Sequence, residues 1–264
     1  KQSGAINSIQ AIKEKTEKKL KKFQNQTEAE RNLEVVTEIR KKNWFERYRW
    51  FMTTDGFLTI GGRDAASNSA VIRKHLDKND KVFHGDIFGS PFFILKDAEA
   101  VPDTTMNEIA HATVCFSRAW REGLYGVSAY WVHPEQIKKS APSGEFLPKG
   151  SFTIEGQRNF IKSETLKLAV GIIQLEDNDH VLTCGPPEAI KKNSICYAII
   201  EPNGLEMAEC AKKIRLEFLK IFEDITRKIN VDEFVRALPA GKSQIKEISL
   251  GDLEKGKIID NELD

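Results

Sequence analysis

Residues 7–42 contain no Gly or Pro, and their polar positions are mainly Lys, Glu and Gln. Between them apolar residues recur at helical spacing, at Ile9, Ile12, Leu20, Phe23, Leu33, Val36 and Ile39. This pattern predicts one long helix. Because the apolar stripe is narrow and breaks between Gln24 and Glu30, we expect half of a helical hairpin or coiled coil, with the partner helix upstream of this chain.

At Asn43 the pattern changes, because aromatic residues become frequent and a core begins. Two apolar stretches flank the Asp55-Gly56 turn signal, which predicts a β-hairpin over residues 49–53 and 57–61. A helix capped by Asp64 or Ser67 is expected to reach His75. The pair Thr105 and Glu108 has capping-box spacing and predicts a helix that runs to about residue 120. Further strands are expected over residues 81–85, 92–96, 126–131 and 151–155, with a loop or lid over 140–150.

Residues 163–264 form a second pattern of strands followed by helices. Strands are expected over residues 166–174, 181–183 and 196–201, and helices over 187–192, 206–228 and 231–238. The sequence therefore predicts an α+β fold, a mixed sheet with helices, preceded by a long coiled-coil-type helix. We divide the chain into a basic helix (1–42), an α+β domain (43–162) and an α+β C-terminal extension (163–264).

Composition fits a soluble chain of one large or two small domains, with 264 residues, 29.9 kDa, 40% hydrophobic and 30% charged residues. The formal net charge of +1 hides a gradient, because residues 1–42 carry +5, residues 43–162 carry +1 and residues 163–264 carry −5. The basic helix is therefore the part best suited to a polyanion. A solvated, lysine-rich helix is an equally good interpretation of the charge alone.

Four cysteines (Cys115, Cys184, Cys196 and Cys210) are scattered without a C-x-x-C pair, which favours neither a disulfide framework nor a zinc site. We interpret them as buried or incidental thiols. No apolar run is long enough to cross a bilayer and no signal peptide is present, so we expect a cytoplasmic protein without membrane contact. Because the chain starts at Lys1 in the middle of a pattern, we expect it to be a piece of a longer protein.

The segment DGFLTIGGRDAASN, residues 55–68, is the first candidate site. It joins a hairpin to a helix start through two glycines, and it places Arg63 and Asp64 at the junction and Asn68 one turn later. Glycines allow close approach of a ligand, a helix N-terminus offers N–H groups, and arginine binds phosphate with a planar fork. These features indicate an anion site. Alternatively, the glycines serve only the turn, and Arg63 pairs with Asp64 or Asp86.

His84 and Asp86 are the second candidate, because residues two apart on a strand point to the same side. A metal or acid/base role is geometrically compatible with this pair. One His and one Asp are too few ligands, however, and the additional candidates are unplaced: Asp55, Asp64, Asp97 and His111. A structural pair is the favoured interpretation.

The third candidate is residues 128–150, where Trp131, Lys138, Lys139 and Ser140 combine an aromatic ring, two cations and a hydroxyl near a Gly/Pro-rich loop. Recognition of single-stranded or looped RNA uses such groups. The alternative is a core Trp followed by a solvated basic turn. The nucleotide-binding, nucleophile-elbow and zinc-protease motifs are absent from the sequence.

Four segments carry a family resemblance: KNWFERYRWFMTTDGFLTIGGRDAASNS, VFHGDIFGSPFFILK, CFSRAW and SAYWVHPEQIKKSAPSGEFLPKGSFTIEGQRNF. In this order they resemble the NFACT-R domain of NEMF-type, fibronectin-binding-protein-A-like ribosome quality-control proteins, over about residues 43–162. The preceding basic helix is similar to the second arm of the family's coiled coil. The segments LAVGIIQ, GPPEAIKKNS and LPAGKSQI resemble the extension found in archaeal and eukaryotic members, and the lack of low-complexity linkers favours an archaeal protein. The sequence departs from the family at Gly85, where Ala is usual, and at Pro91.

The resemblance implies an RNA-binding protein rather than an enzyme, with no cofactor or metal. It implies that the full-length protein recognises large ribosomal subunits obstructed by peptidyl-tRNA and promotes C-terminal tailing of stalled chains. The implied partners are the large ribosomal subunit, tRNA and rRNA, and a coiled-coil partner helix in the longer chain. By motif position, the residues expected to face RNA are Arg63, Asp64, Asn68, His84, Asp86, Trp131, Lys138, Lys139 and Ser140.

Two other functions stay open at this point. One is a metal-dependent nuclease or hydrolase that uses His84 and Asp86 together with Asp64 and Arg63. The other is a protein-interaction module, in which the basic helix and the acidic C-terminal helices bind protein partners.

Overall fold

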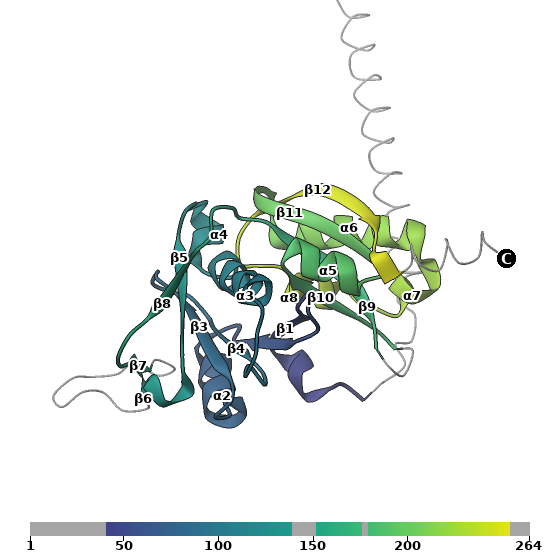
Figure 1. Ribbon diagram of the computed structural model, residues 1–264. Helices are drawn as coiled ribbons and strands as arrows, with labels where there is room; N and C mark the ends of the chain where they lie inside the picture. The colour runs from purple at the N-terminus through teal and green to yellow at the C-terminus, as the bar shows by residue number, and fades with distance from the viewer. Residues whose placement is uncertain (1–40, 139–151, 176–178, 254–264) are drawn as a thin grey trace, which may run out of the picture.

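The computed structural model describes residues 41–138, 152–175 and 179–253. Figure 1 shows two antiparallel β-sheets side by side, with helices packed on them. The α+β class predicted from the sequence is confirmed, but the predicted mixed sheet is wrong, because the described strands form separate, antiparallel sheets. The predicted long helix over residues 1–42 and the loop over 140–150 lie outside the described residues.

The first sheet has six strands in the order β1-β2-β4-β3-β5-β8. Its strands are β1 (Arg49–Met52), β2 (Leu58–Gly61), β3 (Lys81–Gly85), β4 (Phe92–Leu95), β5 (Ser128–Val132) and β8 (Asn159–Lys162). The β1–β2 hairpin forms where the Asp55-Gly56 signal predicted it, because Gly56 adopts a φ of +87° in the turn. A short hairpin of β6 (Ile137–Lys138) and β7 (Thr153–Ile154) stands beside the sheet. Strand β8 was not predicted.

Side chains along these strands point alternately to the two faces of the sheet, and residues on both faces are buried. One face carries Phe83 and Phe93 and is covered by α3 (Asp103–Cys115). The other face carries Phe92 and Tyr130 and is covered in part by α2 (Ala65–His75). A residue's parity on its strand therefore decides which face it joins.

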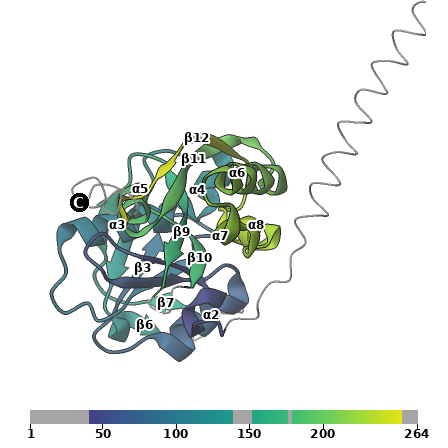
Figure 2. The same cartoon turned by 90° about the vertical axis from the view of Figure 1, so that its right-hand side faces the viewer.

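The second sheet has the order β10-β9-β11-β12. Its strands are β9 (Leu168–Gln174), β10 (His180–Gly185), β11 (Cys196–Leu205) and β12 (Ser243–Leu250). Helix α5 (Pro187–Asn193) lies on one side of this sheet, and α6 (Met207–Ile221), α7 (Glu223–Arg227) and α8 (Val231–Ala237) gather on the other (Figure 2). Strand β9 is buried on both faces, which explains its continuous apolar run. Strand β12, at the edge, was not predicted.

Two predicted helices are shorter than expected. The capping box at Thr105 and Glu108 is wrong, because α3 begins at Asp103 and both residues lie inside it. The Glu108 carboxylate instead accepts hydrogen bonds from the N–H and hydroxyl of Thr54, and the Thr105 hydroxyl donates to Asp55. The predicted helix therefore does not reach residue 120 as one piece. Ser117 has an extended backbone and caps the separate helix α4 (Arg118–Glu122).

The predicted helix over 206–228 is also interrupted. Phe222 leaves helical geometry with a φ of −135° and a ψ of 74°, and this ends α6 and opens α7. Within the described segments, no helix is long and apolar enough to cross a membrane.

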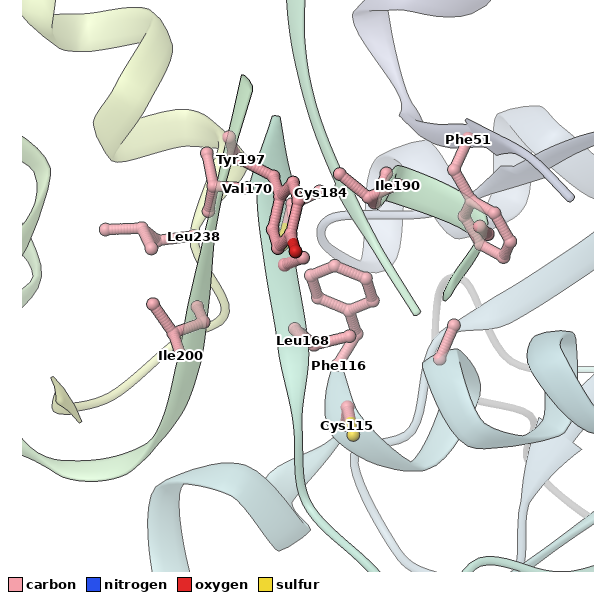
Figure 3. Packing of buried hydrophobic residues seen from close by; sticks show 14 of the residues in the cluster. Phe51, Cys115, Phe116, Leu168, Val170, Cys184, Ile190, Tyr197, Ile200 and Leu238 are labelled. Carbon is pink, nitrogen blue, oxygen red and sulfur yellow. The ribbon is translucent and has the colours of Figure 1, made fainter. Parts of the chain in front are cut away.

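One buried cluster joins the two sheets. Figure 3 shows residues of both sheets, such as Phe51 and Leu168, in this cluster. A Cβ at Gly185 of β10 would lie 2.8 Å from the Phe51 ring, so the glycine allows β1 to pack closely against β10. The Asn193 side chain donates to the main-chain carbonyls of Met52 and Thr53, each at 3.2 Å. Residues 163–253 are thus packed directly on the first sheet, while the division of the chain at residue 162 stays a prediction.

Candidate nucleic-acid interface

Gly61 and Gly62 leave space for side chains of this chain. A Cβ at Gly62 would lie 1.9 Å from Asn68 Oδ1, and one at Gly61 would lie 2.5 Å from the Phe93 ring. The space left by the absent Gly62 side chain is occupied by Asn68 Oδ1, which accepts a hydrogen bond from the Phe92 N–H at 3.1 Å. The two glycines therefore fix α2 against β4, which is the structural role weighed above.

The N-terminus of α2 is closed by its own side chains. Asp64 Oδ1 accepts from the Ser67 N–H at 2.7 Å, and the Ser67 hydroxyl oxygen accepts from the N–H groups of Arg63 (2.7 Å) and Asp64 (2.9 Å). Hydrogen bonds from Ser67 lower the pKa of Asp64, which stabilises its charged form. Several N–H groups expected to hold an anion here are therefore already engaged.

Arg63 turns away from the helix start. Its Nη2 donates to the Tyr48 carbonyl at 2.8 Å, and its Nη1 donates to the carbonyl of Arg236 at the end of α8. Burial, together with the nearby Arg236 charge, lowers the pKa of Arg63 to about 10. Arg63 is thus half-buried between the hairpin and the C-terminal helices rather than paired with Asp64 or Asp86.

His84 lies on β3 opposite Tyr130 of β5. Its ring centroid is 4.6 Å from that of Phe92, and its Nδ1 is 3.4 Å from the Tyr130 hydroxyl. Burial lowers the pKa of His84 to about 4, so the imidazole is neutral at neutral pH. Asp86 follows the strand, is exposed, and donates its N–H to the Ser128 carbonyl at 2.8 Å.

A hollow of about 490 Å³, which we call the aromatic hollow, lies between α2, β3, β5 and the β6–β7 hairpin. Phe92, Tyr130 and Phe152 supply its ring surfaces, and Phe88 stands at its edge with 87% of its surface exposed. The guanidinium carbon of Arg158 lies 4.9 Å from the Tyr130 ring centroid. Four of the predicted residues line this hollow: Arg63, Asp64, Asn68 and His84.

Phe88, Tyr130 and Arg158 were missed by the sequence analysis. Tyr130 and Arg158 lie inside the quoted motif segments, and Tyr130 is paired with His84 on the same sheet face. Strand parity was the available signal, because it separates Tyr130 from its neighbour Trp131.

Comparison with known proteins identifies the domain to which most of these residues belong. The family model of the NFACT protein RNA binding domain matches residues 47–156. This chain contains an NFACT RNA-binding domain. The match confirms the family resemblance predicted from the motifs, and most of the aromatic hollow lies inside the matched residues.

Relatives of the chain are longer proteins. The archaeal Rqc2 homolog aRqcH of Methanocaldococcus jannaschii is 37% identical over 216 residues, which cover 81% of this chain and 31% of that protein. The human ribosome quality control complex subunit NEMF is 33% identical over 171 residues, which cover 64% of this chain and 15% of that protein. The chain thus spans about a third of the archaeal relative's length. A solved structure of the C-terminal part of the fibronectin/fibrinogen-binding protein from Streptococcus suis is similar over 48% of each chain, at 18% identity and a TM-score of 0.39.

Three of the other predicted residues, Asp86, Trp131 and Lys138, do not line the aromatic hollow. Trp131 faces the α3 side of the sheet, where it lines a separate hollow of about 410 Å³ and the Lys81 ammonium lies 5.6 Å from its ring centroid. Lys138 is exposed on β6, donates to the Glu135 carbonyl at 3.1 Å, and lies 3.9 Å from the Glu155 carboxylate. Lys139 and Ser140 lie outside the described residues. The role of all five in RNA binding stays a prediction.

The structure explains why residue 85 is Gly in this chain, where Ala is usual in the family. A Cβ at this position would lie 2.8 Å from Ser90 Oγ, which accepts a hydrogen bond from the Gly85 N–H at the same distance. The Ser90 hydroxyl therefore occupies the space that an alanine methyl group would need.

A metal-dependent hydrolase finds no support in this geometry. Among residues 41–138, 152–175 and 179–253, no group of three or more His, Cys, Asp or Glu side chains is placed to hold a metal ion. Within these segments, no further His, Cys, Asp or Glu side chain joins His84 and Asp86 in a possible metal site.

Proposed function

We propose that this chain is the RNA-binding part of a ribosome-associated quality control factor, and that it acts by binding rather than by catalysis. The observation that carries the proposal is the aromatic hollow with Arg158 at its edge, located largely within the matched RNA-binding domain. The names of the relatives, Rqc2 homolog and ribosome quality control complex subunit, support the same cellular process.

The chemistry of the aromatic hollow suits an unpaired nucleobase. Sequence-tolerant recognition of single-stranded or looped RNA relies on bases stacked against aromatic rings and arginine planes. Phe88 offers an exposed ring, and Arg158 over Tyr130 offers a guanidinium plane. The neutral His84 ring and the Asn68 amide stand where they can form hydrogen bonds with a base edge.

In the cell we propose that the longer protein recognises large ribosomal subunits obstructed by peptidyl-tRNA, with tRNA, rRNA or both as direct ligands of this chain. Such a role fits a cytoplasmic protein without cofactor. The C-terminal tailing of stalled chains belongs, in this proposal, to the full-length protein and its other domains.

The test is fluorescence anisotropy of the chain with a tRNA, an rRNA hairpin and a DNA duplex of equal length. Phe88→Ala and Arg158→Ala remove the stacking groups, and we expect each to weaken RNA binding about tenfold, since one stacked base contributes about 1–3 kcal/mol. Tyr125→Ala and Arg121→Ala are matched controls, because these side chains are also exposed and do not line the aromatic hollow.

RNA-preferring binding that falls only in the first two variants supports the proposal. Equal binding of RNA and DNA that none of the variants changes would refute it. That result would favour the protein-interaction module instead.

A further inference from the structure

A second, smaller cavity of about 50 Å³ lies where the two sheets meet, between β1, β10 and α8; we call it the seam cavity. Four cationic residues line it together with two acidic ones: Lys42, Arg49, Arg63, Arg236, Glu46 and Glu233. Arg63 and Phe116 line both the seam cavity and the aromatic hollow, so the two adjoin.

Among the described residues, neither acidic residue of the cavity forms an ion pair with its three arginines. Glu233 pairs with Lys42 at 3.1 Å, and Glu46 accepts a hydrogen bond from the Asn43 N–H at 2.7 Å. Within the described parts of the chain, no carboxylate lies within 4.0 Å of the guanidinium groups of Arg49, Arg63 or Arg236, and Arg63 Nε is buried without a hydrogen-bond partner. The cavity therefore has an excess of positive charge and an unused donor.

Arg49 and Arg63 also disfavour each other's charge. Burial, together with the charge of the neighbouring Arg63, lowers the pKa of Arg49 to about 9. Two desolvated guanidiniums held close together repel, and main-chain carbonyls neutralise this only in part. A bound anion would relieve the repulsion, and phosphate matches the planar donor geometry of arginine.

The seam cavity and the aromatic hollow differ in volume, so they suit different parts of a nucleotide. A volume of about 50 Å³ exceeds several times what one water molecule needs, but it is far too small for a nucleobase. The adjoining aromatic hollow is about ten times larger, at about 490 Å³. A phosphate group fits the first, and a base fits the second.

We propose that the seam cavity is a phosphate-binding subsite shared by the NFACT-R domain, through Arg49 and Arg63, and the C-terminal extension, through Arg236. It holds a backbone phosphate of the RNA whose base enters the aromatic hollow. The inference rests on the proposed function, and it assigns residues 163–253 a direct part in RNA binding, although they lie outside the matched family model. Free inorganic phosphate shares this chemistry, so the experiment distinguishes the two sources.

Arg236→Ala is the informative variant, because it removes an exposed guanidinium and keeps the main-chain carbonyl that Arg63 contacts. Arg227→Ala on α7 is the matched control, since it also removes one exposed arginine, which there is paired with Glu223. Two measurements are made on the whole chain: anisotropy with an RNA hairpin across a salt series, and thermal unfolding with increasing inorganic phosphate.

We expect Arg236→Ala to weaken RNA binding about tenfold and to reduce the slope of log K against log salt by about one, while Arg227→Ala matches the wild type. An unchanged slope, with only the stabilisation by inorganic phosphate lost, would refute the RNA-backbone ligand. No effect of Arg236→Ala in either measurement would overturn the subsite. If the wild-type chain does not bind RNA, the proposed function is refuted. The titration with inorganic phosphate then tests the subsite independently of RNA.

Discussion

Arg49 offers a sharp test of how the two sheets are joined. Its Nη1 donates to the carbonyls of Ala237 (3.3 Å) and Leu238 (3.2 Å) at the end of α8, and its guanidinium carbon lies 4.2 Å from the Phe116 ring centroid. The partially negative end of a helix favours such a cation. We therefore expect Arg49→Met to loosen α8 from β1 and to destabilise the whole fold.

The expected magnitude follows from the contacts that are lost. A hydrogen bond from a charged donor contributes about 1.5–3 kcal/mol, and a partly desolvated cation over a ring contributes about 1 kcal/mol. Removing a buried charge that repels Arg63 offsets part of this loss. We therefore expect the free energy of unfolding to fall by about 2–3 kcal/mol.

Urea denaturation monitored by tryptophan fluorescence measures this change, as a midpoint lowered by about 1 M at an unchanged m-value. Arg47→Met is the matched control, because Arg47 is an exposed neighbour whose guanidinium carbon lies 5.9 Å from the Tyr48 ring centroid. We expect this control to change stability by less than about 0.5 kcal/mol. Equal midpoints for the two variants would refute the reasoning that Arg49 joins the sheets.

Three further predictions concern the core and the site. Gly62→Ala should lower the free energy of unfolding by about 2 kcal/mol, measured by urea denaturation, because the new methyl group displaces Asn68; wild-type stability would contradict this. His84 has a folded pKa of about 4 against an ordinary 6.5, so its stabilising contribution is complete above pH 6.5 and is lost as the pH falls toward 4. The stability difference between wild type and His84→Gln should therefore shrink over that range by at most about 3 kcal/mol, and a pH-independent difference would argue against a buried neutral His84. Burial raises the pKa of the Cys184 and Cys196 thiols to about 12, so a thiol reagent should label them only as fast as the chain unfolds, whereas prompt labelling in native buffer would contradict their burial.

The thiols also show how composition and structure complement each other. Scattered cysteines without a C-x-x-C pair predicted buried or incidental thiols, and the structure places all four as free, buried residues. The state of the thiols was predicted from the spacing of cysteines along the chain, without knowledge of contacts between distant segments.

Local signals likewise predicted the elements around the site. The Asp55-Gly56 turn, the Asp64 cap of α2 and the short apolar runs of β3 and β4 each act within a few residues. The order of the motifs in residues 43–162 was sufficient to recognise the family, and the match to the family model confirms it. Edge strands β8 and β12 escaped prediction because their faces are half exposed and their apolar pattern is weak.

Capping at Thr105 shows where local reasoning fails. The spacing of Thr105 and Glu108 fits a capping box, yet both side chains bind the β1–β2 turn, about fifty residues earlier. Pattern matching does not distinguish a carboxylate that bonds its own helix from one that bonds a distant turn.

The sequence by itself determined the α+β class, the hairpin and the helix start at Asp64, because turn geometry, capping and periodicity are local properties. The family followed from the resemblance of the motif segments. Tertiary structure alone decided which residues share a surface. Strand parity puts Tyr130 and Trp131 on opposite faces, but only the packing of α3 on one face decided that the face of Tyr130 borders the aromatic hollow. Arg63 reaches a carbonyl 173 residues away on α8, because the buried cluster brings the two sheets together and a buried guanidinium needs acceptors there.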